Sequence, residues 1–221
     1  MVIRVKICCI ATVEEARLAI RYGASAVGLV SEMPSGPGPI PEDKIAEIAA
    51  TVPPGIATFL LTSKASVADI IAQQHYCRTN TIQICDRLHT GNHEELRAAL
   101  PGIRIVQVVH VRDDSSIDEA ISVSRHVDAL LLDSGNQDKA IKELGGTGRV
   151  HDWRLSRRIV AVCKVPVFLA GGLNPGNVAD AIYAVKPFGV DVCSGLRVNG
   201  RLDEQKVSAF FEGVSDGARM L

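Results

Sequence analysis

Eight short apolar runs alternate with eight helical patterns along the 221-residue chain, which predicts an α/β fold, a single (β/α)8 TIM barrel. The runs are almost continuously apolar, as in a parallel sheet that is covered on both faces. With 47% hydrophobic residues the chain can fill one sizeable core, so we expect one domain over residues 1–221. A doubly wound open sheet is the alternative, and it is disfavoured because no dinucleotide fingerprint follows the first strand.

Each strand is expected where apolar and β-branched residues cluster between turn residues. The expected strands are Ile3–Cys9, Ala26–Val30, Ile56–Leu61, Thr81–Ile84, Ile103–Val109, Ala129–Leu132, Val165–Leu169 and Val190–Cys193. Each helix is expected where apolar residues recur with helical spacing. The expected helices are Val13–Tyr22, Pro41–Ala50, Ser66–Gln74, His93–Leu100, Ser116–Arg125, Asp152–Cys163, Asn174–Val185 and Asp203–Gly213. The segment Met33–Pro41, rich in proline and glycine, is then a loop after the second strand.

Charge and cysteine content argue against several classes of function. A net charge of -1 without a block of lysine and arginine argues against a nucleic-acid partner. No apolar run is long enough to span a membrane and no signal region opens the chain, so we expect a cytoplasmic protein with no membrane partner. The six cysteines contain no Cys-x-x-Cys pair and no zinc spacing, so no metal site is expected. The oligomeric state is left open.

Two glycine-rich strand exits follow one another near the end of the chain. The first is LAGGLNP at residues 169–175, and the second is Ser194-Gly195 after the apolar run that begins at Val190. Glycines let the backbone approach a ligand and turn its N–H groups outward, and late exits of a barrel often hold phosphate. We therefore expect a phosphate on Gly171, Gly172, Ser194 and Gly195, the alternative being that these glycines only make tight turns.

Few reactive side chains lie at the expected strand ends. Cys8 lies at the end of the first strand, and Asp133 directly follows the apolar run Leu130–Leu132. A thiol and a carboxyl on opposite sides of a substrate can act as base and acid. The alternatives are a buried structural cysteine and an aspartate that caps a turn. Neighbouring residues of a strand point to opposite faces, so at most one of Cys8 and Cys9 should face a pocket.

A third glycine-rich stretch, Gly145-Gly146-Thr147-Gly148, lies in the loop after the sixth expected strand and is followed by Asp152-Trp153. Glycine and threonine in a loop can approach a phosphate or close over a substrate. We therefore include Gly146 and Thr147 among the candidate substrate-binding residues.

In this order the motifs resemble those of the phosphoribosylanthranilate isomerase family. The matching segments are Lys6-Ile7-Cys8, Leu132-Asp133-Ser134, GGTG at 145–148 with Asp152-Trp153, LAGGLNP at 169–175 with Asn177-Val178, and Gly189–Val192 with Ser194-Gly195. The resemblance extends from Val5 to Phe211. It implies a (β/α)8 barrel of tryptophan biosynthesis that carries out an Amadori rearrangement of a phosphoribosylamine, a phosphorylated sugar substrate.

The resemblance also implies the residue roles. Cys8 matches the general base that removes the C2 proton, and Asp133 matches the general acid that protonates the ring oxygen. The phosphate would rest on the backbone at Gly171, Gly172, Ser194 and Gly195. No metal or organic cofactor is implied.

The chain departs from the family pattern near the aromatic end of the expected substrate. Cys9 stands where the family has glycine, and the second loop lacks the arginine that pairs with the anthranilate carboxylate. Cys85-Asp86 replaces a His-Gly pair, and Arg197 replaces a glutamate. Arg197 would either supply the missing cation or lie on the surface.

Three hypotheses follow from these observations. The first is an isomerase that acts on phosphoribosylanthranilate or on a relative that lacks the carboxylate. The second is a non-catalytic sugar-phosphate-binding barrel, which would need neither Cys8 nor Asp133. The third, another phosphate barrel such as ribulose-phosphate epimerase, would need metal-binding side chains that no expected strand end carries.

Overall fold

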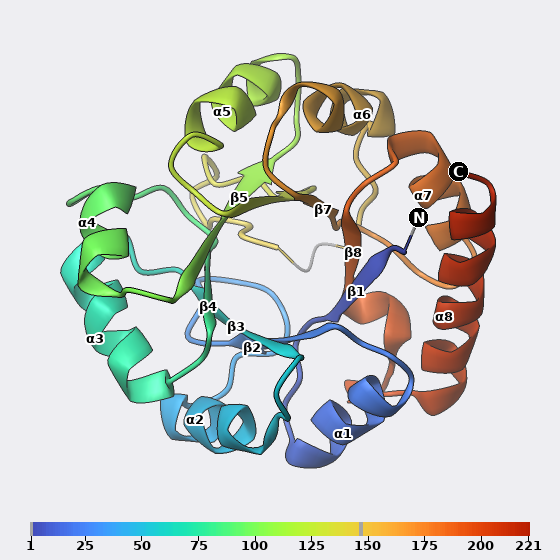
Figure 1. The fold of residues 1–221 in the computed structure, drawn as a ribbon, viewed down its shortest axis with the longest axis horizontal. Helices are drawn as coiled ribbons and strands as arrows, with labels where there is room; N and C mark the ends of the chain where they lie inside the picture. The colour runs from blue at the N-terminus through green and yellow to red at the C-terminus, as the bar shows by residue number, and fades with distance from the viewer. Residues whose placement is uncertain (1, 146–147) are drawn as a thin grey trace.

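The computed structural model describes residues 2–145 and 148–221, and eight parallel strands in it close into a barrel surrounded by helices (Figure 1). The strands are β1 (Arg4–Ile7), β2 (Ala26–Val30), β3 (Ala57–Thr62), β4 (Thr81–Ile84), β5 (Arg104–His110), β6 (Ala129–Asp133), β7 (Val167–Leu169) and β8 (Gly189–Val192). Each strand pairs with the next one along the chain, and β1 pairs with β8 to close the ring. The predicted (β/α)8 barrel is confirmed.

One helix follows each of the eight strands, as expected. The helices are α1 (Val13–Arg21), α2 (Glu42–Thr51), α3 (Val67–Cys77), α4 (His93–Ala99), α5 (Ser115–Val123), α6 (Trp153–Val162), α7 (Val178–Val185) and α8 (Glu204–Arg219). Side-chain capping fixes the first residue of several helices. In α1, for example, the Thr12 side chain accepts a hydrogen bond from the backbone N–H of Glu15 in the first turn. Among the described residues, no helix combines the length and the apolar character that crossing a membrane requires.

The bounds of the last two helices differ from the prediction. α7 starts later than expected, and α8 ends later. α7 begins four residues late because Asn174 forms a turn, its side chain accepting the N–H of Gly176. α8 continues six residues beyond Gly213. Gly213 and Gly217 do not end this helix: a β-carbon on Gly213 would lie 2.7 Å from Val178, so glycine here allows α8 to pack closely on α7.

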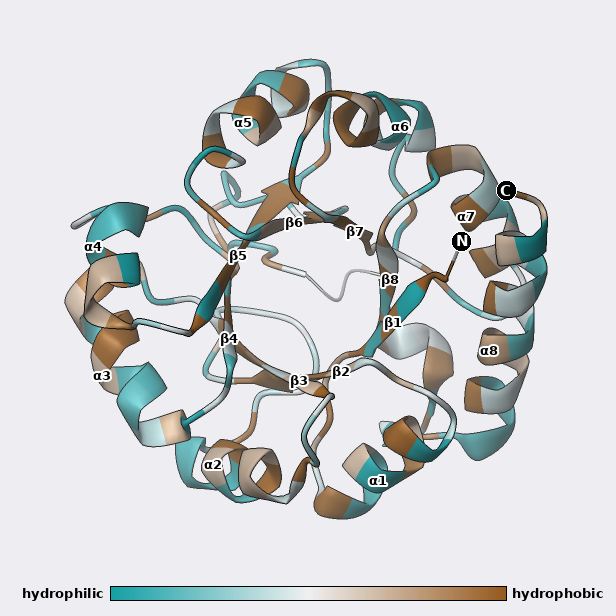
Figure 2. Cartoon of the chain, viewed as in Figure 1, coloured by the Kyte–Doolittle hydropathy of each residue, from teal (hydrophilic) through white to brown (hydrophobic). Residues whose placement is uncertain are grey.

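Apolar side chains fill two layers. One cluster lies between the strands and the helices, and a second fills the inside of the barrel. Figure 2 shows the apolar faces of the helices turned toward the strands. Phe59 and Phe168 meet edge to face inside the barrel, with ring centroids 6.1 Å apart. This packed interior means that a ligand can enter only at an end of the barrel.

A short antiparallel hairpin after β8 was not predicted. It consists of β9 (Arg197–Val198) and β10 (Arg201–Leu202), joined by Asn199 and Gly200. These two residues have φ values of 50° and 77°. Asn-Gly is the preferred pair for such a two-residue turn, so the signal was present in the sequence.

Candidate active site

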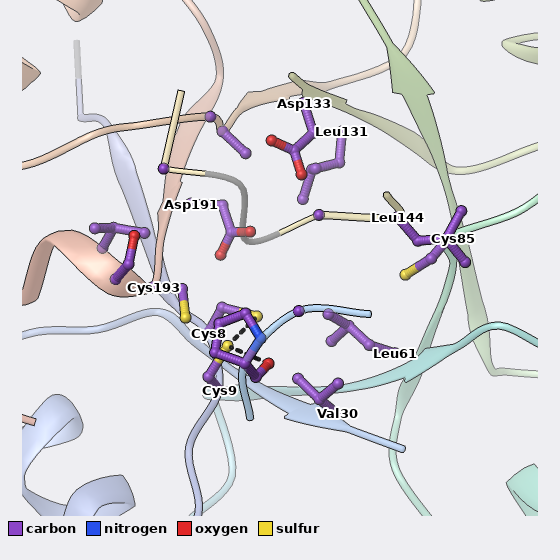
Figure 3. Close-up of a pocket in the computed structure, with 18 of the residues that line it drawn as sticks. Cys8, Cys9, Val30, Leu61, Cys85, Leu131, Asp133, Leu144, Asp191 and Cys193 are labelled. Carbon is purple, nitrogen blue, oxygen red and sulfur yellow. Dashed lines mark hydrogen bonds between the residues drawn. The ribbon is translucent and has the colours of Figure 1, made fainter. Parts of the chain in front are cut away.

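A pocket opens at the end of the barrel where the strands finish, and side chains from many strand exits converge on it (Figure 3). Five of the residues expected in a site line it: Cys8, Asp133, Gly171, Gly172 and Ser194. The loop after β2 and the loop after β6 complete its wall. The structure therefore brings together most of the residues that the sequence pattern selected.

The thiol of Cys8 faces the pocket from the end of β1, and the residue is 6% exposed. Cys9 lines the same pocket, with its Sγ 3.9 Å from the Sγ of Cys8. The expectation that only one of these two thiols could face a pocket was wrong. Regular strand geometry ends at Ile7, and Cys9 has a φ of 61°, in the left-handed region, so strand alternation no longer applies to it.

Asp133 is the last residue of β6 and lies across the pocket from Cys8 (Figure 3). Burial raises the pKa of its carboxyl, although the carboxyl accepts the backbone N–H of Ser134 at 2.7 Å. Two glycines leave space for the carboxyl: a β-carbon would lie 2.9 Å from Oδ2 if added to Gly145, and 3.3 Å from Oδ1 if added to Gly171. The carboxyl is thus enclosed by backbone and is poised to hold a proton.

Lys6 is fully buried inside the barrel, and its Nζ lies 2.9 Å from Oδ1 of Asp191 on β8. Burial by itself would lower the pKa of this lysine, but the negative charges of Asp191 and Cys8 outweigh that effect and raise it. A β-carbon on Gly28 would lie 3.0 Å from both the Lys6 Nζ and the Cys8 Sγ. The ammonium group and the thiol therefore share the space above Gly28.

Sequence reasoning missed this pair, although each member gives a signal. Lys6 is a charged residue within the expected strand Ile3–Cys9, and Asp191 stands between two valines. A charged residue inside an apolar strand of a closed barrel requires a partner in the interior. Asp191 also lines the pocket and is 8% exposed, so one member of the pair reaches the site.

At the exit of β7 the wall of the pocket includes the backbone of two glycines. Gly171 and Gly172 have φ values of 83° and 64°, and both line the pocket. A β-carbon on Gly172 would come within 2.9 Å of the backbone of Arg149 and Val150, so only glycine lets the loop after β6 pack here. The Asn177 side chain fixes this turn by donating to the carbonyl of Gly172 at 3.0 Å.

The exit of β8 contributes Ser194 to the same side of the pocket. Gly195 is not among the described lining residues: a β-carbon there would lie 2.1 Å from the Leu173 carbonyl oxygen, so Gly195 lets the two exits pack together. Gly146 and Thr147 lie outside the described residues.

The expectation that Arg197 lies on the surface was wrong, and the expectation that it supplies the missing cation stays a prediction, since Arg197 does not line the pocket among the described residues. Its side chain is 9% exposed, so it is not a surface group, and Nη1 lies 2.9 Å from the Glu15 carboxylate, so its charge is already paired. It also donates to the Gly200 carbonyl at 2.8 Å and contacts the Cys9 carbonyl. Arg197 thus joins the hairpin after β8 to α1 and the exit of β1. Glu15 is 182 residues away in the chain, which is why no local pattern indicated this pairing.

The loop after β2 folds across the mouth of the pocket. Ser35 lines the pocket, and its hydroxyl donates to the Lys142 carbonyl in the loop after β6 at 2.6 Å. The Cys9 Sγ lies 3.5 Å from the Pro37 carbonyl oxygen. Gly38 has a φ of 91°, and a β-carbon there would lie 2.6 Å from the Cys9 Cβ. The side chain of Cys9 therefore occupies the space that a side chain at position 38 would need.

Gln83 of β4 is a further residue that the sequence did not single out. It lines the pocket and is 3% exposed, and its Oε1 accepts no hydrogen bond from the part of the chain that the structure describes. A buried acceptor without a partner is costly. Gln83 can therefore accept an N–H or O–H of a bound ligand.

Comparison with known proteins agrees with this arrangement. A sequence model for the family described as N-(5'phosphoribosyl)anthranilate (PRA) isomerase matches residues 5–213. The N-(5'-phosphoribosyl)anthranilate isomerase of Methanocella arvoryzae is 33% identical over 212 residues, covering 96% of this chain and 97% of the relative. That of Methanothrix thermoacetophila is 36% identical over 211 residues, with 96% and 97% covered.

Solved structures show the same relationship. The phosphoribosyl anthranilate isomerase of Thermotoga maritima superposes with a TM-score of 0.79 at 28% identity, covering 96% of this chain and 98% of that chain. A phosphoribosyl anthranilate isomerase in complex with reduced 1-(o-carboxyphenylamino)-1-deoxyribulose 5-phosphate superposes with a TM-score of 0.76 at 26% identity, with the same coverage.

Proposed function

The chain belongs to the N-(5'-phosphoribosyl)anthranilate isomerase family, and from this premise we propose that Cys8 is the general base and Asp133 the general acid of its reaction. The family assignment makes the chain an aldose–ketose isomerase that rearranges a phosphoribosylamine, in tryptophan biosynthesis or on a related substrate. The alternative of a non-catalytic sugar-phosphate-binding barrel has no support from the comparisons. The reaction moves hydrogen within one molecule, so the bonds that break and form balance without a second reactant.

The first step needs an acid. The proton held by Asp133 goes to the furanose ring oxygen, the bond from that oxygen to C1 breaks, and a Schiff base forms between C1 and the amine nitrogen. Burial supports this role, because a carboxyl with a raised pKa retains its proton at a pH where an exposed aspartate has lost it.

The second step needs a base. The thiolate of Cys8 removes the proton from C2, which is acidified by the neighbouring Schiff base, and electrons move toward the nitrogen to give an enolamine. Tautomerisation of the enolamine gives the 1-amino-1-deoxyketose. The position of the thiol supports this role: Cys8 lines the pocket opposite Asp133, and its Sγ shares the space above Gly28 with the Lys6 ammonium.

The phosphate is proposed to bind at the exits of β7 and β8. The support is geometric: Gly171, Gly172 and Ser194 line one side of the pocket, and the glycines let the backbone come close to a ligand. Gly195 supports the site indirectly by letting the two exits touch. Gly146 and Thr147 remain candidates for covering the substrate.

The observation that carries the proposal is the placement of Cys8 and Asp133 across one pocket from each other, next to the glycine-rich exits. The experiment is to incubate the purified protein with an N-aryl-5-phosphoribosylamine and to follow the appearance of the ketose by chromatography and NMR. Deuterium at C2 should slow turnover if the Cys8 step is at least partly rate-limiting. Absence of ketose with every arylamine derivative would overturn the proposal.

A further inference from the structure

We infer that the substituent on the substrate nitrogen carries no negative charge, so the preferred substrate is a neutral N-aryl-phosphoribosylamine rather than phosphoribosylanthranilate. This inference rests on the proposed function and deepens it by naming the substrate class. It concerns the half of the pocket that faces away from the exits of β7 and β8, where the amine end of a phosphate-anchored substrate must lie.

This half is walled by apolar side chains from several elements. Val30 lies in β2 and Leu61 in β3, whereas Met33 lies in the loop after β2 and Leu144 in the loop after β6. All four of these residues line the pocket, and Figure 3 labels Val30, Leu61 and Leu144. Buried apolar atoms offer no compensation for a carboxylate, whose removal from water is costly. They suit the faces of an uncharged aromatic ring.

The charge inside the pocket is also unfavourable for a carboxylate. Of the described residues that line it, none is lysine, arginine or histidine, so no lining side chain offers a positive charge; Asp191 is paired with Lys6 and Asp133 is proposed to hold a proton. Residues 146 and 147, which follow the lining residue Gly145 and are not described by the structure, are glycine and threonine, whose side chains carry no charge. Lys6 is paired with Asp191 beneath the pocket and is itself fully buried.

Three cations around the mouth have acidic partners elsewhere. Arg197 pairs with Glu15, as described above. Lys142 pairs with Asp86 at the exit of β4, and Arg87 pairs with Asp138 at 3.3 Å. A carboxylate on the substrate would have to displace one of these acids to pair with any of these three cations, and Lys64, which does not line the pocket, is tested separately below.

Backbone could bind a carboxylate as it is proposed to bind the phosphate, but the loop after β2 is poorly suited to this. Pro34, Pro37 and Pro39 have no N–H group to donate. Gly36 and Gly38 have φ values of 99° and 91°, and Cys9 fills the space beside Gly38, so a basic side chain at either glycine would be strained. The loop therefore contains no cationic side chain, and a cationic side chain would be strained at Gly36 or Gly38.

Ser35 is the position at which the inference can be tested. Its side chain already lines the pocket, and its φ is not among the positive values, so a longer side chain is compatible with the backbone. Ser35→Arg introduces a cation at the mouth, and Ser35→Met is the matched control with similar length and no charge.

The experiment compares two substrates that differ only by the carboxylate, N-(5-phosphoribosyl)aniline and N-(5-phosphoribosyl)anthranilate. We expect kcat/KM of the unmodified protein to favour the aniline derivative by about 30-fold, the effect of leaving a buried charge without its partner. Ser35→Arg should shift the ratio toward the anthranilate derivative by at least about 10-fold, and Ser35→Met should leave it unchanged. A ratio at or below tenfold in the unmodified protein overturns the inference.

Affinity separates this inference from the proposed function. The reduced, unreactive product analogues with and without the carboxylate can be compared by calorimetry whether or not turnover occurs. If neither substrate is rearranged, the proposed function is wrong, and the affinity ratio still decides the charge preference. Lys64 follows β3 and does not line the pocket, so Lys64→Met should leave the ratio unchanged. A selective loss with the anthranilate derivative would show that Lys64 is the carboxylate partner and would overturn the inference.

Discussion

The two halves of the pocket are built in different ways. At the exits of β7 and β8 the wall is backbone, with Gly171 and Gly172 in left-handed conformations. At the exits of β2 and β3 the wall is side chains such as Val30 and Leu61. A backbone wall depends on glycines and turn residues that few substitutions can replace, whereas a side-chain wall can change its specificity one residue at a time. The proposed phosphate site thus lies in the half that tolerates few substitutions, and the proposed amine site lies in the half that tolerates more.

The largest expected effect concerns the charged pair beneath both halves. Lys6→Met should lower the free energy of unfolding by about 3–5 kcal/mol, because it leaves the carboxylate of Asp191 buried without a partner. Urea unfolding measures this loss. Arg21→Met is the control, since it breaks an exposed pair with Glu204 and should cost about 1 kcal/mol or less. A similar loss in both variants would show that the buried pair does not support the floor of the pocket.

The proposed base and acid, Cys8 and Asp133, line the same pocket, so their removal should affect turnover more than binding. Cys8→Ser and Asp133→Asn should each lower kcat by at least about 100-fold, with little change in KM because the phosphate remains anchored. Steady-state kinetics on an N-aryl-phosphoribosylamine test this. Cys163→Ser, at the end of α6, should retain full activity. Near-normal kcat in either variant would remove that residue from the mechanism.

The backbone half can be tested by adding a single methyl group. Gly172→Ala should raise KM by about 10-fold, because the new β-carbon meets the backbone of Arg149 and Val150 and distorts the proposed phosphate site. Gly55→Ala is matched for conformation, since Gly55 also has a positive φ but has nothing within 4 Å of its β-carbon. The control should therefore show the strain of alanine without the change in KM. Equal KM values in the two variants would contradict a backbone phosphate site.

The smallest expected effect is a dependence of stability on pH that comes from Asp133. Burial raises its pKa in the folded protein, so the unfolded state ionises first as the pH rises above about 3.9, the ordinary value for aspartate. Ionisation therefore favours unfolding, and the native protein should lose stability relative to Asp133→Asn between acidic and neutral pH. Unfolding free energies of both proteins at pH 3.5 and pH 7 test the sign. A stability advantage of Asp133→Asn over the unmodified protein that is larger at pH 3.5 than at pH 7 would contradict it.

The sequence predicted the barrel because its signals are local and repeated. The bounds of β2 and β4 agree with the expected strands, since each apolar run is closed by turn residues on both sides. The site could be anticipated in the same way, because in a parallel barrel every strand exit reaches one end. Cys8, Asp133 and the glycines of the β7 exit needed only their position after a strand to be placed in one pocket.

What the sequence could not predict depends on single conformations and distant pairs. The left-handed φ of Cys9 turned a second thiol into the pocket. The partner of Arg197 is 182 residues away, and that of Lys6 is 185 residues away. The φ of 99° at Gly36, which the loop sequence does not reveal, would strain a cationic side chain there, so the charge preference is tested at Ser35. The spacing of apolar residues along the sequence predicts helices and strands, but it indicates neither a left-handed φ at a single residue nor a partner far away in the chain.

The pairing of Lys6 with Asp191 has a consequence for synthesis on the ribosome. β1 is the first strand to leave the ribosome, but Asp191, the partner of its Lys6, is added to the chain 185 residues later. Until β8 emerges, the Lys6 ammonium has to stay in water, and the strand that carries Cys8 cannot take its final place. The thiol is thus among the first groups to be translated and among the last to be positioned, which delays the appearance of a reactive centre until the ring can close.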